Sequence, residues 1–466
     1  MDPSREGALW AGICDQIRQQ IRSGTLLPGD RIPPSRAMAE ELGVSRGTVL
    51  AAIELLIAEG LLEGRRGSGT FVAQDATASP VSNRRQKRLP PRVLRVIPDV
   101  DPSTDSRINF QPCRPSLEAF PVTPWRRAFA AAAEFTRGPD YGDPRGEPRL
   151  REAIATYLRR ARGLQVEPDE ILISNGAIQA VHWLCRLFAR PGDSVAMEDP
   201  GYPLARQAFE LNGARVVSYP VDEHGLVVDA LPADGGGHRL VYVTPSHQFP
   251  TGSRLSRPRR VQLIDWAVAN GVLVLEDDYD GEFRYDVPPL PPLASLSTCG
   301  YVIYLGTFSK TLFPSLRIGF TVAPRELIDE LAAYRNALDY QCGALPQIAL
   351  ARFIEDGDFE RHILRMRRIY AQKRRALREA MADCNFPGEL CGIDSGINGT
   401  VLLEPGVPPA RVVAAAAKRG IYVTPIERYR QHPVSDDRAL ILGYGALSEA
   451  QIGRGIASLA SIVQSA

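Results

Sequence analysis

The sequence predicts two folded parts, a small helical module at the amino terminus and a large α/β domain that follows it. Over residues 8–72 apolar positions recur at helical spacing and end in a glycine-rich hairpin. From Ile108 onward, short apolar strands alternate with helical stretches, which is the α/β pattern. The stretch between them is rich in Pro, Ser and Arg, as linkers are. We therefore expect domains at residues 8–74 and 107–466, joined by a flexible basic linker at 75–106.

Composition narrows the class of protein. The 466 residues are 44% hydrophobic and 23% charged, which is a globular composition, and the formal net charge is +1. Because the net charge is so small, any nucleic-acid binding must come from local basic clusters. Seven cysteines without C-x-x-C spacing argue against a disulfide scaffold and a structural zinc site, and no metal is expected. The polar amino terminus and the lack of an apolar run of about 20 residues predict a cytoplasmic protein with no signal peptide and no membrane contact.

A lysine at a predicted strand end gives the strongest chemical signal. The apolar run Tyr301–Leu305 indicates a buried strand, and it continues as Gly-Thr-Phe-Ser-Lys to Lys310, with Arg317 seven residues later. An amine condenses with an aldehyde, while hydroxyls and a guanidinium hold a phosphate dianion. A second apolar strand, at 272–280, ends in carboxylates, which suit a protonated pyridine nitrogen. Together the two segments predict a Schiff-base cofactor with a phosphate group.

The amino-terminal module has the layout of a helix-turn-helix. Apolar spacing predicts a helix over 9–21, and Ser35 is expected to cap a short helix at 36–42. A glycine-containing turn follows, and Ser45 is expected to cap the next helix, at 46–60. The start of this second helix is polar and basic, where a recognition helix meets base edges and phosphates.

A basic hairpin completes this module. Residues 61–72 predict a strand, a turn and a strand, with Arg65 and Arg66 near the tip. The strings P-G-D-R-I-P-P-S-R, L-G-V-S-R-G-T-V and E-G-L-L-E-G-R-R-G-S-G-T-F-V resemble the winged helix of GntR-type bacterial regulators. The resemblance implies operator DNA as a partner, with Arg36 and Arg46 making most phosphate and guanine contacts. The residues expected to contact DNA are Arg36, Ser45, Arg46, Thr48, Arg66 and Gly67.

Residues 108–466 resemble fold-type I aminotransferases, through Y-G-D-P-R-G-E-P, S-N-G-A-I-Q-A, E-D-P-G-Y, T-P-S-H-Q-F-P-T-G, E-D-D-Y-D and the lysine segment, in the expected order. The combination with a winged helix resembles the MocR-type subfamily of GntR regulators. It implies pyridoxal 5'-phosphate as cofactor and a mixed seven-stranded sheet with helices on both faces, followed by a small carboxyl-terminal α/β subdomain. It also implies a homodimer with sites at the subunit interface, where Tyr141 reaches the phosphate of the partner's cofactor.

The same resemblance implies a role for each motif residue. Lys310 would be the Schiff-base lysine, Asp277 the partner of the pyridine nitrogen, Tyr279 the partner of the phenolic oxygen, and Tyr202 the stacking ring. A strand end followed by a helix start also forms an anion site from free backbone N–H groups. The residues expected around the phosphate are Asn175, Gly176, Ala177, Ile178, Thr307, Ser309 and Arg317. Of the remaining carboxylates, Asp278 and Asp280 are expected to face solvent or cap a turn.

Two departures from the aminotransferase pattern bear on function. Phe249 stands where most aminotransferases have an asparagine that bonds the phenolic oxygen, and His247 or Gln248 is a candidate substitute. Ile441 or a neighbour stands where an arginine usually binds the substrate α-carboxylate. Leu204 occupies a further position where one member of the subfamily is expected to have an arginine. The possible replacements are Arg114, Arg206, Arg428 and Arg430.

These features predict a transcription regulator whose pyridoxal-phosphate domain senses a small amine, amino acid or B6 vitamer and controls operator binding. The missing arginine favours an effector other than a simple α- or γ-amino acid, such as a B6 vitamer. The alternative is an active aminotransferase with an accessory DNA-binding domain, since the lysine, aspartate and tyrosine are retained. Multiple-turnover transamination would favour the enzyme, because catalysis requires productive substrate geometry in addition to the cofactor.

Overall fold

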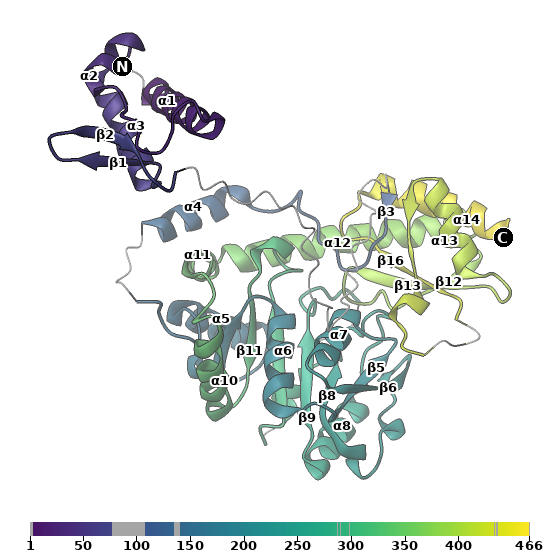
Figure 1. Ribbon diagram of the computed structural model, residues 1–466. Helices are drawn as coiled ribbons and strands as arrows, with labels where there is room; N and C mark the ends of the chain where they lie inside the picture. Colours follow the sequence, from purple (N-terminus) through teal and green to yellow (C-terminus); the bar gives the residue numbers. More distant parts are fainter. Residues whose placement is uncertain are drawn as a thin grey trace. The chain divides into compact units, whose positions relative to one another are not determined.

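A computed structural model describes residues 3–76, 108–134 and 140–465, apart from 287, 289, 298, 433, 435 and 436 (Figure 1). The chain divides into two compact units, residues 1–99 and 100–466, and each is described by itself. The expected linker at 75–106 lies outside the described residues beyond Ala76.

The amino-terminal unit is a three-helix module with a hairpin. Its elements are α1 (Pro3–Ser23), α2 (Ser35–Glu41), α3 (Arg46–Ala58), β1 (Leu62–Arg65) and β2 (Gly69–Val72). The two strands are antiparallel, with Leu62 opposite Val72. Buried apolar residues of the three helices and the two strands form one core together with Ile32, which precedes α2. They are Ile13, Cys14, Ile17, Ile21, Ile32, Met38, Val49, Ala52, Ile53, Leu56, Leu62 and Val72.

Sequence patterns located both helix starts, but only one of the two expected caps is present. The Ser45 hydroxyl accepts a hydrogen bond from the Thr48 backbone N–H at 3.1 Å, so the cap of α3 is confirmed. The expected Ser35 cap is wrong, because α2 begins at Ser35 itself and the cap position is Pro34, which makes no side-chain cap. Pro34 is extended (φ −57, ψ 141), so the helical conformation starts directly after it.

The large unit is organised around one mixed sheet in the order β4-β11-β10-β9-β8-β5-β6-β7. The expected seven strands are extended to eight by the two-residue β7, which pairs antiparallel with β6. β11 runs antiparallel to both β10 and β4, whereas β10, β9, β8, β5 and β6 are parallel. The strands are β4 (Ile171–Ser174), β5 (Ser194–Asp199), β6 (Arg215–Asp222), β7 (Gly225–Leu226), β8 (His238–Val243), β9 (Leu273–Asp278), β10 (Val302–Thr307) and β11 (Gly319–Val322).

Helices pack on this sheet through three apolar clusters, each of which combines helix residues with buried residues of the strands. α4 packs against α11, and α5 packs against α11 as well. The helices are α4 (Val122–Ala133), α5 (Pro148–Arg162), α6 (Ala177–Phe188), α7 (Pro203–Leu211), α8 (Arg257–Asn270), α9 (Leu293–Leu296), α10 (Arg325–Leu338) and α11 (Ala344–Glu355). Short 3₁₀ helices lie at Pro168–Glu170, Val228–Ala230, Gly235–Gly237, Pro314–Leu316 and Ile426–Tyr429.

A long helix, α12 (Asp358–Asp383), leads into a smaller subdomain (Figure 1). Its sheet has the order β12-β13-β16-β15 and is antiparallel throughout, and a separate two-residue pair, β3 and β14, is parallel. The elements are β3 (Ile108–Asn109), β12 (Gly388–Cys391), β13 (Asn398–Leu403), α13 (Pro409–Lys418), β14 (Ile421–Tyr422), β15 (Thr424–Pro425), β16 (Ala439–Gly443) and α14 (Glu449–Gln464).

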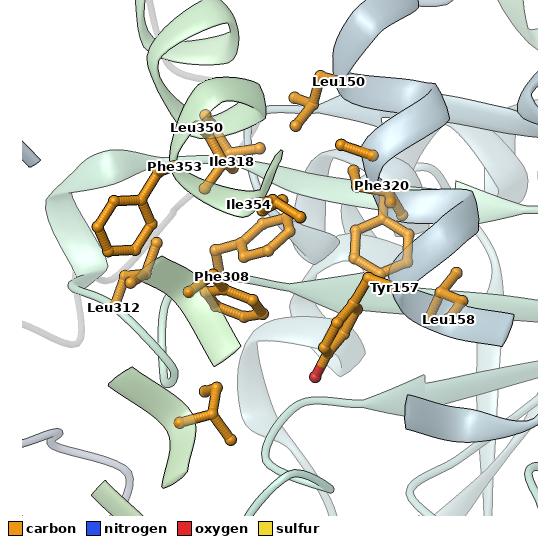
Figure 2. Packing of buried hydrophobic residues seen from close by; sticks show 14 of the residues in the cluster. Leu150, Tyr157, Leu158, Phe308, Leu312, Ile318, Phe320, Leu350, Phe353 and Ile354 are labelled. Carbon is orange, nitrogen blue, oxygen red and sulfur yellow. The ribbon is translucent and has the colours of Figure 1, made fainter. Parts of the chain in front are cut away.

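The loop that bears Lys310 is anchored in the core of the large unit. Phe308 and Leu312, on either side of the lysine, are almost completely buried. Figure 2 shows both side chains packed among Phe353, Ile354 and Ile318. Burying two large apolar side chains stabilises this loop by about 3–6 kcal/mol relative to an exposed one. The backbone at Lys310 is therefore fixed by its neighbours.

Candidate cofactor site and DNA-binding surface

The predicted cofactor residues gather at one edge of the large sheet. β4, β10, β9, β8 and β5 run in the same direction, so their carboxyl ends meet there. Ligands of open α/β sheets bind outside these strand ends. Lys310 follows β10, Asp277 lies at the end of β9, and Tyr202 follows β5.

Lys310 is half-buried and points toward the loop after β3. Its Nζ donates a hydrogen bond to the backbone carbonyl oxygen of Cys113 at 2.9 Å. Cys113 adopts a positive φ of 61°, which turns the chain at this point. Burial raises the pKa of the Cys113 thiol to about 12, against the opposing charge of Lys310, so the thiol is neutral at physiological pH.

Asp277 offers a buried acceptor. The Tyr242 hydroxyl donates to Asp277 Oδ2 at 2.5 Å, while Oδ1 is buried and has no hydrogen-bond partner among the described residues. Burial raises the pKa of Asp277 to about 6, and the Tyr242 hydrogen bond and the charge of Lys310 lower it. An unpartnered buried carboxylate oxygen costs free energy unless a donor reaches it, so the group fits the protonated nitrogen of a pyridine ring.

The residues expected around the phosphate meet where α6 begins. Gly176 caps α6 with φ +93°, directly before Ala177 and Ile178. Arg317 donates from Nη2 to the Asn175 carbonyl oxygen at 2.7 Å. A Cβ atom on Gly176 would lie 2.8 Å from the same nitrogen, and the backbone conformation at this position (φ 93, ψ 162) favours glycine.

Two hydroxyls lie just before Lys310, that of Thr307 at the end of β10 and that of Ser309 on the loop that follows. Thr307 Oγ1 donates to Ser309 Oγ at 3.0 Å and accepts from the Ser309 backbone N–H at 3.2 Å. Hydroxyls, a guanidinium and the amino end of a helix are the donors that a phosphate requires. The described residues hold no group of three or more His, Cys, Asp or Glu side chains placed to bind a metal ion.

Aromatic and apolar side chains form one cluster beside these polar groups. Phe249 packs edge-on against Tyr202, Tyr279 and Tyr429, with ring centroids 5.5, 6.1 and 5.1 Å apart. Ile441 is completely buried in the same cluster. The position expected to bind a carboxylate is therefore apolar in this chain.

Tyr279 joins a buried histidine–aspartate pair. Its hydroxyl lies 2.9 Å from His247 Nδ1, and the same nitrogen lies 2.9 Å from Asp280 Oδ2. The expectation that Asp280 faces solvent or caps a turn is wrong, because its side chain is almost fully buried against His247. Burial lowers the pKa of His247, but the charge and hydrogen bond of Asp280 raise it more, and the pKa ends above its ordinary value.

Asp278 is also buried, so the same expectation is wrong for this residue. Its carboxylate forms an ion pair with Arg162, the last residue of α5, and accepts from the Tyr304 hydroxyl at 2.7 Å. Side chains alternate along a strand, so Asp278 points away from Asp277, toward the helix that covers the opposite face. There an arginine compensates its charge.

The two candidate substitutes for the missing asparagine have different environments. Gln248 Nε2 donates to the carbonyl oxygens of Pro200 and Phe249 at 2.8 and 2.7 Å, and its Oε1 accepts from Thr251 Oγ1 at 2.7 Å. Gln248 is thus engaged in holding its own turn. His247, in contrast, reaches the hydroxyl of Tyr279.

None of the four candidate arginines is fully buried. Arg430 pairs with Asp437 at 2.6 Å, and Arg206 donates to the Tyr429 carbonyl oxygen at 3.3 Å. Arg428 is exposed and donates to the Tyr422 hydroxyl at 3.3 Å, while Arg114 is exposed. Tyr141 is exposed as well, and its ring stacks on Tyr340 at 4.2 Å between centroids. Leu204 is also exposed.

Sequence patterns missed Tyr242 and Cys113. Tyr242 lies inside the apolar strand β8, where a tyrosine is an ordinary core residue. Its role depends on β8 lying next to β9, a pairing that local sequence does not reveal. Cys113 contributes through its backbone carbonyl group, which no side-chain pattern marks.

The predicted DNA-contacting residues lie at the start of α3, on α2 and in the hairpin turn. Arg36, Arg46, Arg66 and Gly67 are exposed. Thr48 is buried, and its hydroxyl lies 2.8 Å from that of the exposed Ser45. Arg65, in contrast, pairs with Glu63 at 2.6 Å and lies over the Phe71 ring at 4.7 Å. No helix in the described parts is long and apolar enough to cross a membrane.

Comparison with known proteins covers both units. The family described as "Aminotransferase class I and II" matches residues 111–452, and "Bacterial regulatory proteins, gntR family" matches residues 9–72. Kynurenine aminotransferase from Pyrococcus horikoshii is similar with 29% identity and a TM-score of 0.71 over 78% of this chain and 91% of that one. LysN, the α-aminoadipate aminotransferase of Thermus thermophilus complexed with N-(5'-phosphopyridoxyl)-L-leucine, has 28% identity and a TM-score of 0.70, over 77% and 92%.

Curated relatives span the whole chain. The probable rhizopine catabolism regulatory protein MocR of Rhizobium meliloti is 36% identical over 96% of this chain and 92% of the relative. The pyridoxine biosynthesis regulator PdxR of Corynebacterium glutamicum is 34% identical over 96% and 94%. A winged helix joined to an aminotransferase-like domain defines a DNA-binding transcription regulator with pyridoxal 5'-phosphate as its cofactor. Within this class the chain belongs to the MocR-type subfamily of GntR regulators, as its motifs predicted.

Proposed function

We propose that pyridoxal phosphate binds to Lys310, that a small molecule is sensed at this site, and that the occupied state changes the operator affinity of the winged helix. The observation that supports this proposal is the placement of an amine and a buried acceptor at one sheet edge. Lys310 follows β10, and the unpartnered Oδ1 of Asp277 belongs to the adjacent strand β9. A pyridine aldehyde requires an amine at its aldehyde group and an acceptor at its ring nitrogen.

The proposal gives each side chain a task. When bound, the cofactor supplies an electrophilic aldehyde and an electron-withdrawing ring. Asp277 would hold the ring nitrogen in its protonated form, Tyr279 would donate to the phenolic oxygen, and Tyr202 would cover the ring face. The phosphate would lie among Asn175, Gly176, Ala177, Ile178, Thr307, Ser309 and Arg317.

The chemistry of the effector follows from the apolar cluster. Ile441, Phe249 and Tyr429 offer no cation to a carboxylate, and the pairing of Arg430 with Asp437 directs that arginine elsewhere. The cluster favours an amine without a carboxylate there, or the B6 vitamer itself, over a simple amino acid. Titrating the apo protein with pyridoxal phosphate while following operator affinity tests the vitamer. Unchanged affinity across saturation would exclude it.

A working aminotransferase is the second candidate, because the lysine and the aspartate are both retained and the similar solved structures are aminotransferases. Multiple turnovers with an amino donor and a keto acid acceptor would support it. Against it, the buried Ile441 offers an α-carboxylate no bidentate partner at that position, and productive geometry would then depend on another arginine such as Arg114.

We further propose a homodimer in which Tyr141 reaches the partner's cofactor phosphate. Support comes from large apolar side chains that a single copy leaves exposed, around α4, α11 and the loop of Tyr141. They are Leu117, Val122, Phe129, Tyr141, Leu338, Tyr340 and Leu345. Sedimentation analysis tests the assembly, and a monomer at micromolar concentration would contradict it. Binding to chromosomal DNA would place the protein in the cytoplasm.

For operator DNA we propose contacts by Arg36, Arg46, Arg66 and Gly67, with Ser45 and Thr48 completing the start of α3. The exposed guanidiniums suit phosphates and guanine edges. Transmission to these residues requires that the effector bind two states of the protein with different affinity.

The decisive experiment is reduction of the loaded protein with borohydride, followed by peptide mapping. A pyridoxyl adduct on Lys310 is expected, together with visible absorbance that Lys310→Ala removes. Lys418→Ala, at the exposed end of α13, is the matched control and should keep both signals. An adduct on another lysine, or an unlabelled peptide from fully loaded protein, would contradict the proposal.

A further inference from the structure

Tyr279, His247 and Asp280 form a buried hydrogen-bonded group with one shared nitrogen. His247 Nδ1 lies 2.9 Å from the Tyr279 hydroxyl and 2.9 Å from Asp280 Oδ2. Its other nitrogen, Nε2, faces the Gly392 carbonyl oxygen at 3.4 Å. All three side chains are at least nine-tenths buried, so water does not replace these contacts.

The position of one proton follows from this geometry. An unprotonated Nδ1 would set its lone pair against the Asp280 carboxylate, so Nδ1 must carry the hydrogen and donate it. A protonated nitrogen cannot accept from Tyr279. The Tyr279 oxygen is therefore a second acceptor for the Nδ1 hydrogen, and its own O–H must point elsewhere.

The free hydroxyl proton has no protein acceptor among the described residues. The ring of Phe249, 6.1 Å away between centroids, offers no polar atom. Burial and the charge of Asp280 raise the pKa of Tyr279 well above its ordinary value, so the proton stays on the phenol. A donor without an acceptor in a buried site requires one from a ligand.

The packing holds the group in this arrangement. A Cβ atom on Gly396 would lie 2.1 Å from His247 Cε1 and 2.5 Å from Asp280 Oδ2, so the backbone closes directly over the pair. The other ionisable side chains that act on the group are Asp277, Tyr242, Cys113 and Arg254.

We infer that His247 and Asp280 are a positioning pair that holds the Tyr279 hydroxyl so that it donates to the cofactor's phenolic oxygen. The inference rests on the proposed binding of the cofactor at Lys310. In this view His247 does not replace the missing asparagine directly but acts through Tyr279. Asp280 acts one residue further away, by fixing which ring nitrogen of His247 carries the hydrogen.

The pair is testable through the proton on the Schiff base nitrogen of the loaded protein. The negative phenolic oxygen of the cofactor stabilises the proton on the Schiff base nitrogen, and a hydrogen bond from Tyr279 to that oxygen reduces this stabilisation. Removing the Tyr279 hydrogen bond should therefore raise the pKa of the Schiff base by about one to two units, as expected for a hydrogen bond to a charged group. The readout is the visible absorbance of the loaded protein as a function of pH.

Asp280→Asn is the informative variant. The neutral amide no longer holds the histidine hydrogen on Nδ1. With that hydrogen on Nε2, facing the Gly392 carbonyl oxygen, the single lone pair of Nδ1 can accept the Tyr279 hydrogen, which then no longer reaches the cofactor. We expect Asp280→Asn to raise the Schiff base pKa as much as Tyr279→Phe does, and the double variant to add nothing. The matched control is His238→Gln, since His238 is also buried and bonded to a tyrosine, Tyr219, at 2.6 Å. That variant should titrate like the unaltered protein.

The outcomes separate the inference from the proposed function. If Tyr279→Phe shifts the titration and Asp280→Asn does not, or if the two shifts add, the positioning pair is overturned while the cofactor site stands. If no adduct forms at Lys310, the proposed function itself fails. Should Asp280→Asn not fold, His247→Asn and His247→Leu give the same contrast. The asparagine amide can donate from the place of Nδ1 and should leave the Schiff base pKa unchanged, whereas leucine has no donor and should raise that pKa.

Discussion

The hydroxyl of Tyr242 donates to one oxygen of Asp277 at 2.5 Å, and the other oxygen is buried with no partner in the part of the chain that the structure describes. The bonded oxygen fixes the orientation of the carboxylate. The remaining oxygen is thereby oriented before a cofactor arrives, and such preorganisation reduces the free-energy cost of binding. Because only the ionised carboxylate can accept from a protonated ring nitrogen, the affinity for the cofactor should depend on the protonation state of Asp277.

Cofactor binding to the apo protein should weaken as pH falls below about 6. Burial raises the pKa of Asp277 to about 6, so at lower pH a proton must leave before the carboxylate can pair with the ring nitrogen. The expected loss approaches tenfold in affinity per pH unit. Fluorescence titration at several pH values measures it. Asp277→Asn should bind the cofactor weakly, and its affinity should no longer depend on pH in this range. If the affinity of that variant still fell with pH as steeply, the pH dependence would belong to the cofactor's own ionisable groups.

The opposite sign applies to the stability of the apo protein. The folded state holds the Asp277 proton more tightly than the unfolded chain, whose pKa is about 4. This contribution favours the folded state below that pH and is lost as pH rises toward about 6. Tyr242→Phe removes a hydrogen bond that lowers the pKa, so the midpoint of cofactor binding should move to higher pH. A midpoint unchanged by this variant would show that Tyr242 does not tune Asp277.

Local patterns in the sequence located the sheet edge because strands, turns and their polar ends are encoded within a few residues. The apolar run before Lys310 and the carboxylates after 272–275 are both visible without a structure. The burial of the Asp278 side chain against Arg162 could not be predicted in this way, because the two residues are 116 positions apart along the chain. The same holds for Tyr242 and Asp277, which are 35 residues apart. Contacts between residues so far apart depend on how the strands and helices pack, which a local sequence pattern does not contain.

The Arg162–Asp278 ion pair should be essential for the stability of the large domain. Both side chains are about 2% exposed, and removing one leaves a buried charge without compensation. Asp278→Ala should cost about 3–5 kcal/mol in the free energy of unfolding. The control is Glu355→Ala, which breaks the more exposed pair with Arg149 and should cost less than about 1 kcal/mol. Urea unfolding of the apo protein compares the two, and equal costs would contradict this role.

Arg46→Ala should abolish operator binding in a gel retardation assay while leaving the fold and the cofactor absorbance intact. Arg46 is exposed, and its hydrogen bond to Ser35 Oγ is long, at 3.3 Å, so little stability is lost with it. Losing a guanine contact would cost about 1–3 kcal/mol of binding free energy. Losing a phosphate contact would reduce the slope of log affinity against log salt concentration by about 1. Arg65→Ala is the matched control, since Arg65 is engaged by Glu63 and Phe71. Retained binding by the Arg46 variant would remove this residue from the interface.

Gly176→Ala should weaken cofactor binding about tenfold or more without unfolding the protein. The substitution places a Cβ atom 2.8 Å from Arg317 Nη2, so the guanidinium must leave the amino end of α6. The backbone conformation of Gly176 (φ 93, ψ 162) is one that essentially only glycine adopts, so an alanine adds strain of about 1–3 kcal/mol. Gly163→Ala is the control for a Cβ atom at a positive φ without a crowding neighbour: Gly163 is left-handed (φ 66, ψ 15), and an added Cβ there meets nothing within 4 Å among the described residues. If both variants lose stability but only Gly176→Ala loses affinity for pyridoxal phosphate, Arg317 contributes to the phosphate site. Equal affinities would show that the space beside Gly176 is not used by the phosphate.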